Sequence, residues 1–317
     1  MAASFMSKLL LLAGALAGAQ AFAPEGVPAL CTSVLTRRAD LRARPPQSRP
    51  SFPSALSQSR AATRRADPRA GPPRLSFPST DLGSPSMQPL GLANAAVAVA
   101  WVGLVAFANA FSPGEFGSTA DAGLVTTLIA NPTSPMDAGL SPVFALIFNL
   151  FLPVPLMLAA LLLPTSREQR VPALPFVGAS LALGFFTLGP YLALRGAPQP
   201  LDADGKAPPF GFFDTRAFGV LVFALVCSIP VSAQVFQVND WSSAVADFLQ
   251  LLESSKLVSV SCADLSVLSV TLACLVREDS CRRDFGNPNA LCAISLLLPA
   301  FAPAVYFLLR PRGPTSE

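Results

Sequence analysis

Six long apolar runs constrain the fold of this chain more than any other feature of its sequence. Each is close to the roughly 20 residues that a helix, rising 1.5 Å per residue, needs to cross the hydrocarbon core of a bilayer. Lipid offers the backbone no hydrogen-bond partners, so we expect the runs to be helices. The sequence therefore predicts an all-α, polytopic transmembrane helical bundle of about six spans within residues 87–317. The expected spans are 90–111, 143–163, 172–194, 217–238, 257–276 and 288–309.

Composition agrees with a membrane protein. Hydrophobic residues make up 52% of the chain and charged residues only 13%. Residues 87–317 hold eleven basic and fifteen acidic side chains, so the basic excess of the whole chain belongs to its N-terminal part. Nothing basic in the predicted bundle indicates nucleic acid. The partner that we expect is the lipid bilayer.

Basic residues in the short loops predict the orientation of the bundle. The loop 112–141 has no Lys or Arg, which places it on the translocated side. Arg167 and Arg170 follow the second run and place that loop on the opposite side, which is not translocated. Arg310 and Arg312 place the C-terminal tail there as well. Six spans satisfy this arrangement, because an even number brings both ends to one side.

One loop disagrees with this scheme. Arg277, Arg282 and Arg283 would lie on the translocated side, although neighbouring acids offset part of their charge. In a five-span alternative, 257–276 lies in the membrane interface, which rescues this loop but moves the C-terminal tail outside. We expect six spans.

Two polar residues within the apolar runs are candidate intramembrane sites. Asp264 is the one acid in the six runs, and a charge at that depth is costly and often functional. It could instead be protonated, paired with Arg277, or part of a shallow span. Asn149 lies within the second run, where we expect it to join helices by a hydrogen bond rather than bind an ion.

Prolines interrupt several of the runs. Pro153 and Pro155 lie in the second run, Pro230 in the fourth, and Pro299 and Pro303 in the sixth. Each removes a helical hydrogen bond. They are typical either of broken helices around a substrate cavity, as in transporters, or of ordinary kinks. We favour kinks, since no inverted repeat relates the first three runs to the last three.

The inventory of reactive side chains is small. The 317 residues include no histidine, which excludes imidazole ligands and a histidine general base. The cysteines show no C-x-x-C spacing. We therefore expect no enzyme, no catalytic residue, and no bound cofactor or metal.

The N-terminal part predicts a subcellular location. Residues 1–21 have the pattern of a signal peptide cleaved between Ala21 and Phe22. Residues 22–86 hold ten arginines against four acids, with many Ser and Pro, and are predicted to be a disordered, transit-peptide-like region. A basic arm for nucleic acid or anionic lipid is the alternative. A Phe directly after the cleavage site and a basic tract behind it resemble the two-part leader of algae with secondary, red-type plastids.

A second resemblance extends over about residues 128–310. It is carried by Ala130-Asn131-Pro132, by Pro142–Leu150, by Pro172–Phe176, by Pro190-Tyr191, and by Glu253–Lys256 with Asp264. These motifs are similar to those of a group of uncharacterised multi-span proteins of chloroplasts and cyanobacteria. The resemblance implies a multi-pass protein of the plastid inner envelope or thylakoid membrane, and it supplies no catalytic residue.

Two functions from different classes follow. The first is a non-enzymatic accessory or assembly factor of plastid membranes, with photosynthetic membrane complexes as partners. The alternative is a carrier or channel for an ion or small solute, favoured by the interrupted helices, Asp264 and Asn149.

Overall fold

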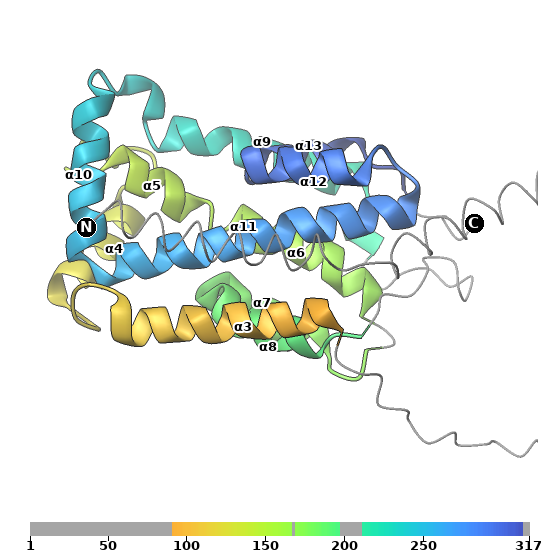
Figure 1. The fold of residues 1–317 in the computed structure, drawn as a ribbon. Helices are drawn as coiled ribbons and strands as arrows, with labels where there is room; N and C mark the ends of the chain where they lie inside the picture. The colour runs from red at the N-terminus through yellow and green to blue at the C-terminus, as the bar shows by residue number, and fades with distance from the viewer. Residues whose placement is uncertain (1–90, 167–168, 197–210, 313–317) are drawn as a thin grey trace, which may run out of the picture. The chain divides into compact units, whose positions relative to one another are not determined.

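The computed structural model describes residues 91–166, 169–196 and 211–312, and every regular element in these ranges is a helix (Figure 1). This confirms the helical bundle. Four stretches are long and apolar enough to cross a membrane: Ala93–Phe111, Pro142–Thr165, Arg216–Gln237 and Lys256–Arg283. The predicted signal peptide and the predicted disordered region, 1–21 and 22–86, lie outside the described residues.

The first half of the bundle has two long stretches and a pair of short helices. Its elements are α3 (Leu92–Ala106) with the π-helical turn η1 (Phe107–Phe111), α4 (Thr119–Ala130), α5 (Pro142–Asn149), α6 (Pro153–Leu162) with η2 (Leu163–Thr165), α7 (Ala173–Leu183) and α8 (Phe185–Leu194). Ser141 caps α5 by accepting the N–H of Phe144. Pro153 begins α6, so the second predicted run is interrupted near its middle, at the position of its prolines.

The second half repeats this order. Its elements are η3 (Gly211–Asp214), α9 (Arg216–Ser232), η4 (Val235–Gln237), α10 (Trp241–Ser254), α11 (Lys256–Arg283), α12 (Pro288–Leu297) and α13 (Phe301–Leu309). Ser255 caps α11 through the N–H of Val258. Figure 1 shows α11 along the middle of the bundle and α10 lying across one end of it.

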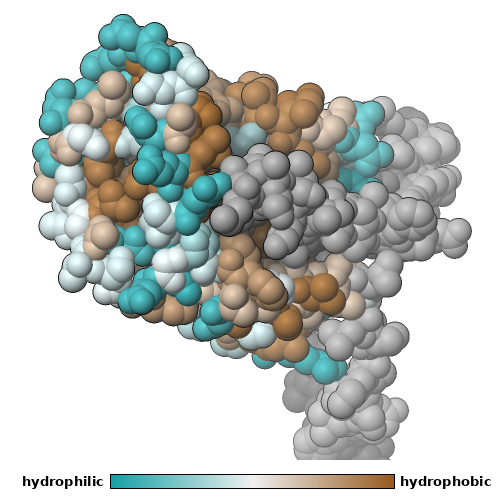
Figure 2. Space-filling view, turned by 60° about the vertical axis from the view of Figure 1, so that its left-hand side comes forward, coloured by the Kyte–Doolittle hydropathy of each residue, from teal (hydrophilic) through white to brown (hydrophobic). Residues whose placement is uncertain are grey.

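The two ends of the bundle differ in charge. At the end that we call the arginine end, Arg195 and Arg310 bind acids near the C-terminus of α11. At the other, the acidic end, Asp121 of α4 accepts hydrogen bonds from Ser255 Oγ and from the first turn of α11. Of the nine Lys and Arg in the described ranges, only Lys256 lies at the acidic end. Figure 2, with the acidic end turned forward, shows hydrophilic residues on that end and hydrophobic ones along the helices behind it.

Helices α7 and α8 form a hairpin. Gly184, with φ 57° and ψ −136°, turns the chain between them in a conformation that suits only glycine. The rings of Phe176 and Tyr191 stack across the two arms, with centroids 5.9 Å apart. Gln169, before the first arm, accepts the N–H of Gly196, after the second, at 2.7 Å. Both ends of this first hairpin therefore lie together, and its tip lies inside the bundle.

Helices α12 and α13 form a second hairpin, turned at Ala300 with φ 67° (Figure 1). Arg277 of α11 donates to Asn289 at the start of α12, at 2.9 Å. Arg283 donates to the carbonyl of Pro311, just after α13, at 2.7 Å. The start and the end of this hairpin thus both lie at the arginine end.

These hairpins leave the prediction of about six spans unconfirmed, because only four stretches of the described residues are long and apolar enough to cross a membrane. The runs 172–194 and 288–309 were expected to cross the membrane, but each folds back near its middle. Hydropathy could not reveal this, because an apolar run has the same composition whether it is straight or folded. The five-span alternative, with 257–276 at the interface, gains no support, since these residues belong to α11, a 28-residue helix that is long and apolar enough to cross a membrane.

The order of elements is duplicated. In each half, a long helix runs from the arginine end to the acidic end, a shorter helix follows there, a second long stretch returns, and a hairpin comes last. The first helix of each half packs on the second arm of its own hairpin, α3 on α8 and α9 on α13. Glycines allow this close approach: a Cβ at Gly189 would lie 2.5 Å from Trp101, and one at Gly219 would lie 2.5 Å from the Phe307 carbonyl oxygen. The repeat is direct, not inverted.

The sequence carries the same duplication over the hairpins. Residues 180–195 align without gaps on 295–310, a shift of 115 positions, and seven of the sixteen pairs are identical. The identical pairs are Ser180/Ser295, Leu181/Leu296, Leu183/Leu298, Phe186/Phe301, Tyr191/Tyr306, Leu194/Leu309 and Arg195/Arg310. The same shift of 115 relates Asn149-Leu150 to Asp264-Leu265. The two candidate polar residues therefore occupy equivalent positions in the two halves.

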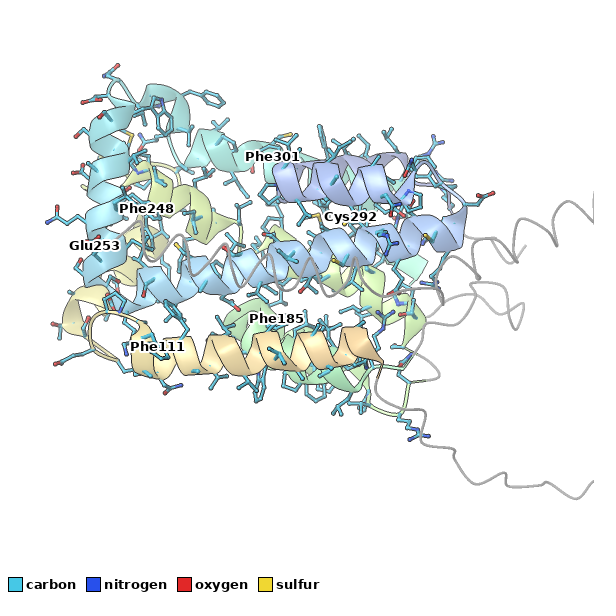
Figure 3. The ribbon with its side chains drawn as sticks, viewed as in Figure 1. Phe111, Phe185, Phe248, Glu253, Cys292 and Phe301 are labelled. Carbon is cyan, nitrogen blue, oxygen red and sulfur yellow. The ribbon has the colours of Figure 1, made fainter. Side chains whose placement is uncertain are left out.

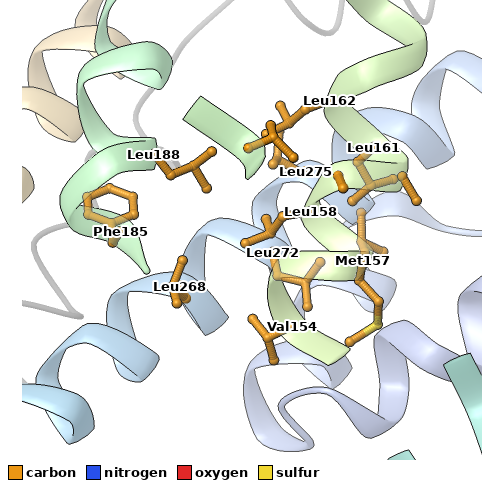
Figure 4. Close-up of a cluster of buried hydrophobic side chains, with 14 of the residues drawn as sticks. Val154, Met157, Leu158, Leu161, Leu162, Phe185, Leu188, Leu268, Leu272 and Leu275 are labelled. Atoms are coloured by element: carbon orange, nitrogen blue, oxygen red, sulfur yellow. The ribbon is translucent and has the colours of Figure 1, made fainter. Parts of the chain in front are cut away.

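The core between the halves is aliphatic. Leucines of α6 and α11 interlock there, and the first hairpin adds Phe185 and Leu188 (Figure 4). Leu158, Leu268 and Leu272 are fully buried. Such burial stabilises each side chain by about 1.5–3 kcal/mol in water, whereas in lipid close packing takes over this role.

Candidate functional site

Asp264 lies at the tip of the first hairpin. Its side chain projects from α11, is only 4% exposed, and accepts the backbone N–H of Phe185 at 2.8 Å through Oδ1. Phe185 is the first residue of α8, so its N–H has no partner within that helix. The carboxylate thus satisfies a donor that the break at Gly184 leaves open, and it lies at the positive end of the α8 dipole.

Glycine at position 184 is a condition of this contact. A Cβ there would overlap the Asp264 carboxylate, which lies directly against the turn. Asp264 and Gly184 therefore fit as a pair, although 80 residues separate them. Figure 3 places Phe185 and Phe301, from the tips of the two hairpins, at similar levels along the length of α11.

No basic side chain in the described ranges forms an ion pair with Asp264. Pairing with Arg277 was one expectation, but Arg277 lies thirteen residues along α11 and binds Asn289. Helices α3, α5, α6, α7 and α8 contain no acidic or basic residue. Within the described ranges, the recorded hydrogen-bond partner of the carboxylate is the backbone N–H of Phe185.

Asn149 ends α5, at the interruption of the second long stretch. Its side chain is half-buried and makes no hydrogen bond to another described residue, so the expected hydrogen bond between helices is not found. Its carbonyl accepts the N–H of Leu152 in the turn toward α6. Asn149 and Asp264 are equivalent in the repeat, and of the two only the acid holds a hairpin tip.

Arginines fasten both hairpins at the arginine end. Arg195, just after α8, makes a two-pronged contact with Glu278, with its shorter bond at 2.8 Å, and also reaches Thr165. Arg310, just after α13, binds Asp279 at 2.9 Å. These equivalent arginines bind neighbouring acids of α11.

Asp279 is shared by several donors. Besides Arg310 it accepts from Arg283 at 2.8 Å and from the Tyr306 hydroxyl at 2.9 Å. Arg310 also donates to the carbonyl of Phe213, which joins η3 to the cluster. We interpret the cluster as a structural fastening, because its members form hydrogen bonds and ion pairs with one another and leave little exposed surface.

The remaining predicted residues fall into two groups. Arg170 and Arg312 are exposed at the arginine end, the same end as Arg310. Arg167, with the predicted cleavage residues Ala21 and Phe22, lies outside the described residues. Within the described ranges, no group of three or more His, Cys, Asp or Glu side chains is placed to hold a metal ion.

Sequence reasoning found Asp264 but missed its partners. In the sequence, Gly184 within an apolar run indicates a helix-packing position, and no local pattern connects it to an aspartate so far along the chain. The shift of 115 positions was the one available signal, because it aligns Asp264 with Asn149 and one hairpin with the other.

Comparison of the chain with protein-family models, with curated proteins and with solved structures finds no match.

Proposed function

We propose that this protein is a membrane carrier or channel for an ion or small solute. The observation that carries the proposal is the pair of interrupted apolar segments at equivalent positions of two tandem repeats. Interrupted helices that meet within an internal repeat are the usual site of substrate and ion binding in transport proteins. At the first interruption, the tip of the α7–α8 hairpin is bound by Asp264 of α11, the one acid in the six apolar runs.

All six apolar runs then lie in the bilayer, but in two ways. Four stretches cross it, and the hairpins α7–α8 and α12–α13 enter from the arginine end and return to it. Non-helical backbone at membrane depth requires burial in protein. The first turn meets this condition, because Gly184 is buried and the Phe185 N–H is bound to Asp264. At the second turn Ala300 is 1% exposed, whereas Leu298 beside it is 55% exposed.

Charge supports one orientation in the membrane. Eight of the nine described Lys and Arg lie at the arginine end, which the positive-inside rule places on the stromal or cytoplasmic side. Arg277, Arg282 and Arg283, which conflict with a six-span scheme, lie on that side when only four stretches cross. The acidic end holds Glu115, Asp121, Asp137, Asp240, Asp247 and Glu253.

We propose a plastid membrane, thylakoid or inner envelope, as the location. The support is the sequence of the leader: a signal-peptide pattern ending at Ala21, Phe22 directly after it, and the basic tract that follows. A fluorescent fusion of residues 1–90 tests the address by whether it enters the plastid.

The second candidate function is a non-enzymatic accessory or assembly factor that binds photosynthetic membrane complexes. The aliphatic core between α6 and α11 favours it, because leucines rather than polar groups fill the interface of the two halves. A carrier with this core would need to separate its halves during transport.

Solute flux distinguishes the two functions. The purified protein is reconstituted in liposomes, and swelling is followed by light scattering after mixing with isotonic thiocyanate salts of sodium, potassium and choline, whose permeant anion balances the cation charge, or with small neutral solutes. A carrier or channel accelerates swelling with at least one solute over protein-free liposomes. Unchanged swelling with every solute, together with co-purification of a photosynthetic complex from membranes, would instead establish the accessory role.

A further inference from the structure

We propose that Asp264 is the binding site of a small monovalent cation, either a proton or an alkali ion, and that transport depends on this ion. The inference rests on the proposed function, which it deepens by naming the ion class and the residue. It is carried by the geometry of the hairpin tip, by the burial of the carboxylate and by the repeat.

The first step is the uncompensated charge. An ionised carboxylate removed from water needs a counter-charge or a full set of hydrogen bonds. Asp264 is 4% exposed and has one hydrogen bond, from the Phe185 N–H to Oδ1. Its second oxygen, Oδ2, lies against Gly184, and the bond from Phe185 is the one hydrogen bond recorded for this carboxylate among the described residues. A bound cation would supply the missing partner.

The second step is the surroundings of the carboxylate. Of the helices that contact α11, neither α3, α5 nor α6 has a titratable side chain, and α8 has only Tyr191. The second hairpin and α10 bring their titratable groups toward the ends of α11. On α11 itself, Cys262 is the nearest. The charged or titratable groups of these elements are Tyr191, Cys292, Tyr306, Asp247, Glu253, Lys256, Cys262, Cys274, Arg277, Glu278, Asp279, Cys281, Arg282 and Arg283.

Lys256, the nearest cation toward the acidic end, is already engaged. Its Nζ donates to the Ala108 carbonyl at 3.3 Å and lies 4.2 Å from the centre of the Phe116 ring. It begins α11, eight residues before Asp264, a rise of about 12 Å along a helix. It therefore does not neutralise the carboxylate.

The third step is the supply of further oxygens. A helix ends with carbonyls that lack intrahelical donors, and α7 ends at Leu183, directly before the turn that contacts Asp264. The negative end of the α7 dipole and the carboxylate thus meet at one place. Backbone carbonyls of broken helices, with a carboxylate, are typical alkali-ion ligands in carriers. A divalent ion fits less well, because its sites usually combine several carboxylates.

The repeat provides an internal comparison. Asn149 occupies the position of Asp264 in the first half and is neutral. The shared position accounts for the placement of a polar group at this depth but not for its charge. A charge in one half only is expected of a single ion site, not of a packing position common to both halves.

Thermal unfolding of the purified, detergent-solubilised protein tests the ion site without reference to transport. The unfolding midpoint is measured in sodium, potassium or choline chloride at constant ionic strength, and across the pH range in which the protein stays folded. A ligand that binds only the folded state raises the midpoint. We expect the wild type to respond to sodium, to potassium or to protons, and Asp264→Asn to lose that response. Glu253→Gln, which removes an exposed acid of α10, should keep it.

A measurement on the wild type covers the case in which Asp264→Asn fails to fold. Dicyclohexylcarbodiimide reacts with protonated carboxyls in apolar surroundings, and mass spectrometry reads the adduct at Asp264. The bound alkali ion, or removal of the proton at high pH, should slow this labelling several-fold. Labelling that is independent of both ion and pH would overturn the site, as would a response that Asp264→Asn and the wild type share.

The site and the proposed function can fail separately. Ion-dependent stability that requires Asp264, without flux in liposomes, would leave an ion site in a protein that is not a carrier. Flux that persists in Asp264→Asn with unchanged ion dependence would retain the carrier and refute the site.

Discussion

Replacement of Gly184 by alanine should destabilise the protein severely, for two separate reasons. The turn at φ 57° and ψ −136° lies where a residue with a Cβ costs about 1–3 kcal/mol. The new Cβ would also displace the Asp264 carboxylate and break its bond to the Phe185 N–H. A hydrogen bond to a charged group contributes about 1.5–3 kcal/mol. Together we expect a loss of about 2.5–6 kcal/mol.

Gly178→Ala is the matched control, since Gly178 lies in α7, six residues before the turn. A Cβ there meets no atom within 4 Å, and alanine favours a helix over glycine by about 1 kcal/mol. Chemical denaturation of the detergent-solubilised variants, followed by circular dichroism, should show Gly178→Ala at least as stable as the wild type.

A double variant separates the two causes. In Asp264→Ala the carboxylate is absent, so adding Gly184→Ala should cost only the backbone strain. The two substitutions should therefore be non-additive by about 1.5–3 kcal/mol. If Gly184→Ala unfolds at the wild-type denaturant concentration, the tip is not held as described and the reasoning is refuted.

Two further predictions concern the arginine end and the orientation of the chain. Arg310→Ala should cost about 3 kcal/mol in the same denaturation assay, the low end for a broken buried pair, because Asp279 keeps its bond to Arg283. The exposed Arg312→Ala should change stability by under about 0.5 kcal/mol, and equal effects of the two substitutions would contradict a fastening role of Arg310. Cysteines introduced at Thr119 and at Ser166 should react with an impermeant reagent from opposite faces of sealed membranes, and reaction of both from one face would disprove the crossing between them.

The sequence was sufficient for the helical bundle, and the reason is physical. Long apolar runs in lipid must satisfy their own backbone, so composition alone predicts helices. The runs 143–163 and 257–276 lie within membrane-length helical stretches of the structure, and 217–238 matches a third to within one residue. Ser255, directly before α11, is a conventional capping residue.

The hairpins were beyond the reach of hydropathy. A run such as 172–194 has the same hydropathy whether it crosses the membrane or folds back. The contact of Gln169 with Gly196 shows that it folds back. Gly184 was visible, but a glycine in an apolar helix is more often a packing position. The partner of Asp264 was equally hidden, because it is a backbone amide, and every residue but proline has one.

The bond between Asp264 and the Phe185 N–H also affects the order in which the chain folds during synthesis. The two residues are 79 positions apart, so the first hairpin leaves the ribosome well before its acceptor exists. At about 5–20 residues per second, the delay is roughly 4–16 s. During that interval the amide at the hairpin tip must remain near water or accept a temporary partner, such as a chaperone or the insertion machinery. The hairpin of the first repeat therefore gains its last hydrogen bond only when the second repeat is synthesised. Although the two repeats are alike, their order of synthesis matters for folding.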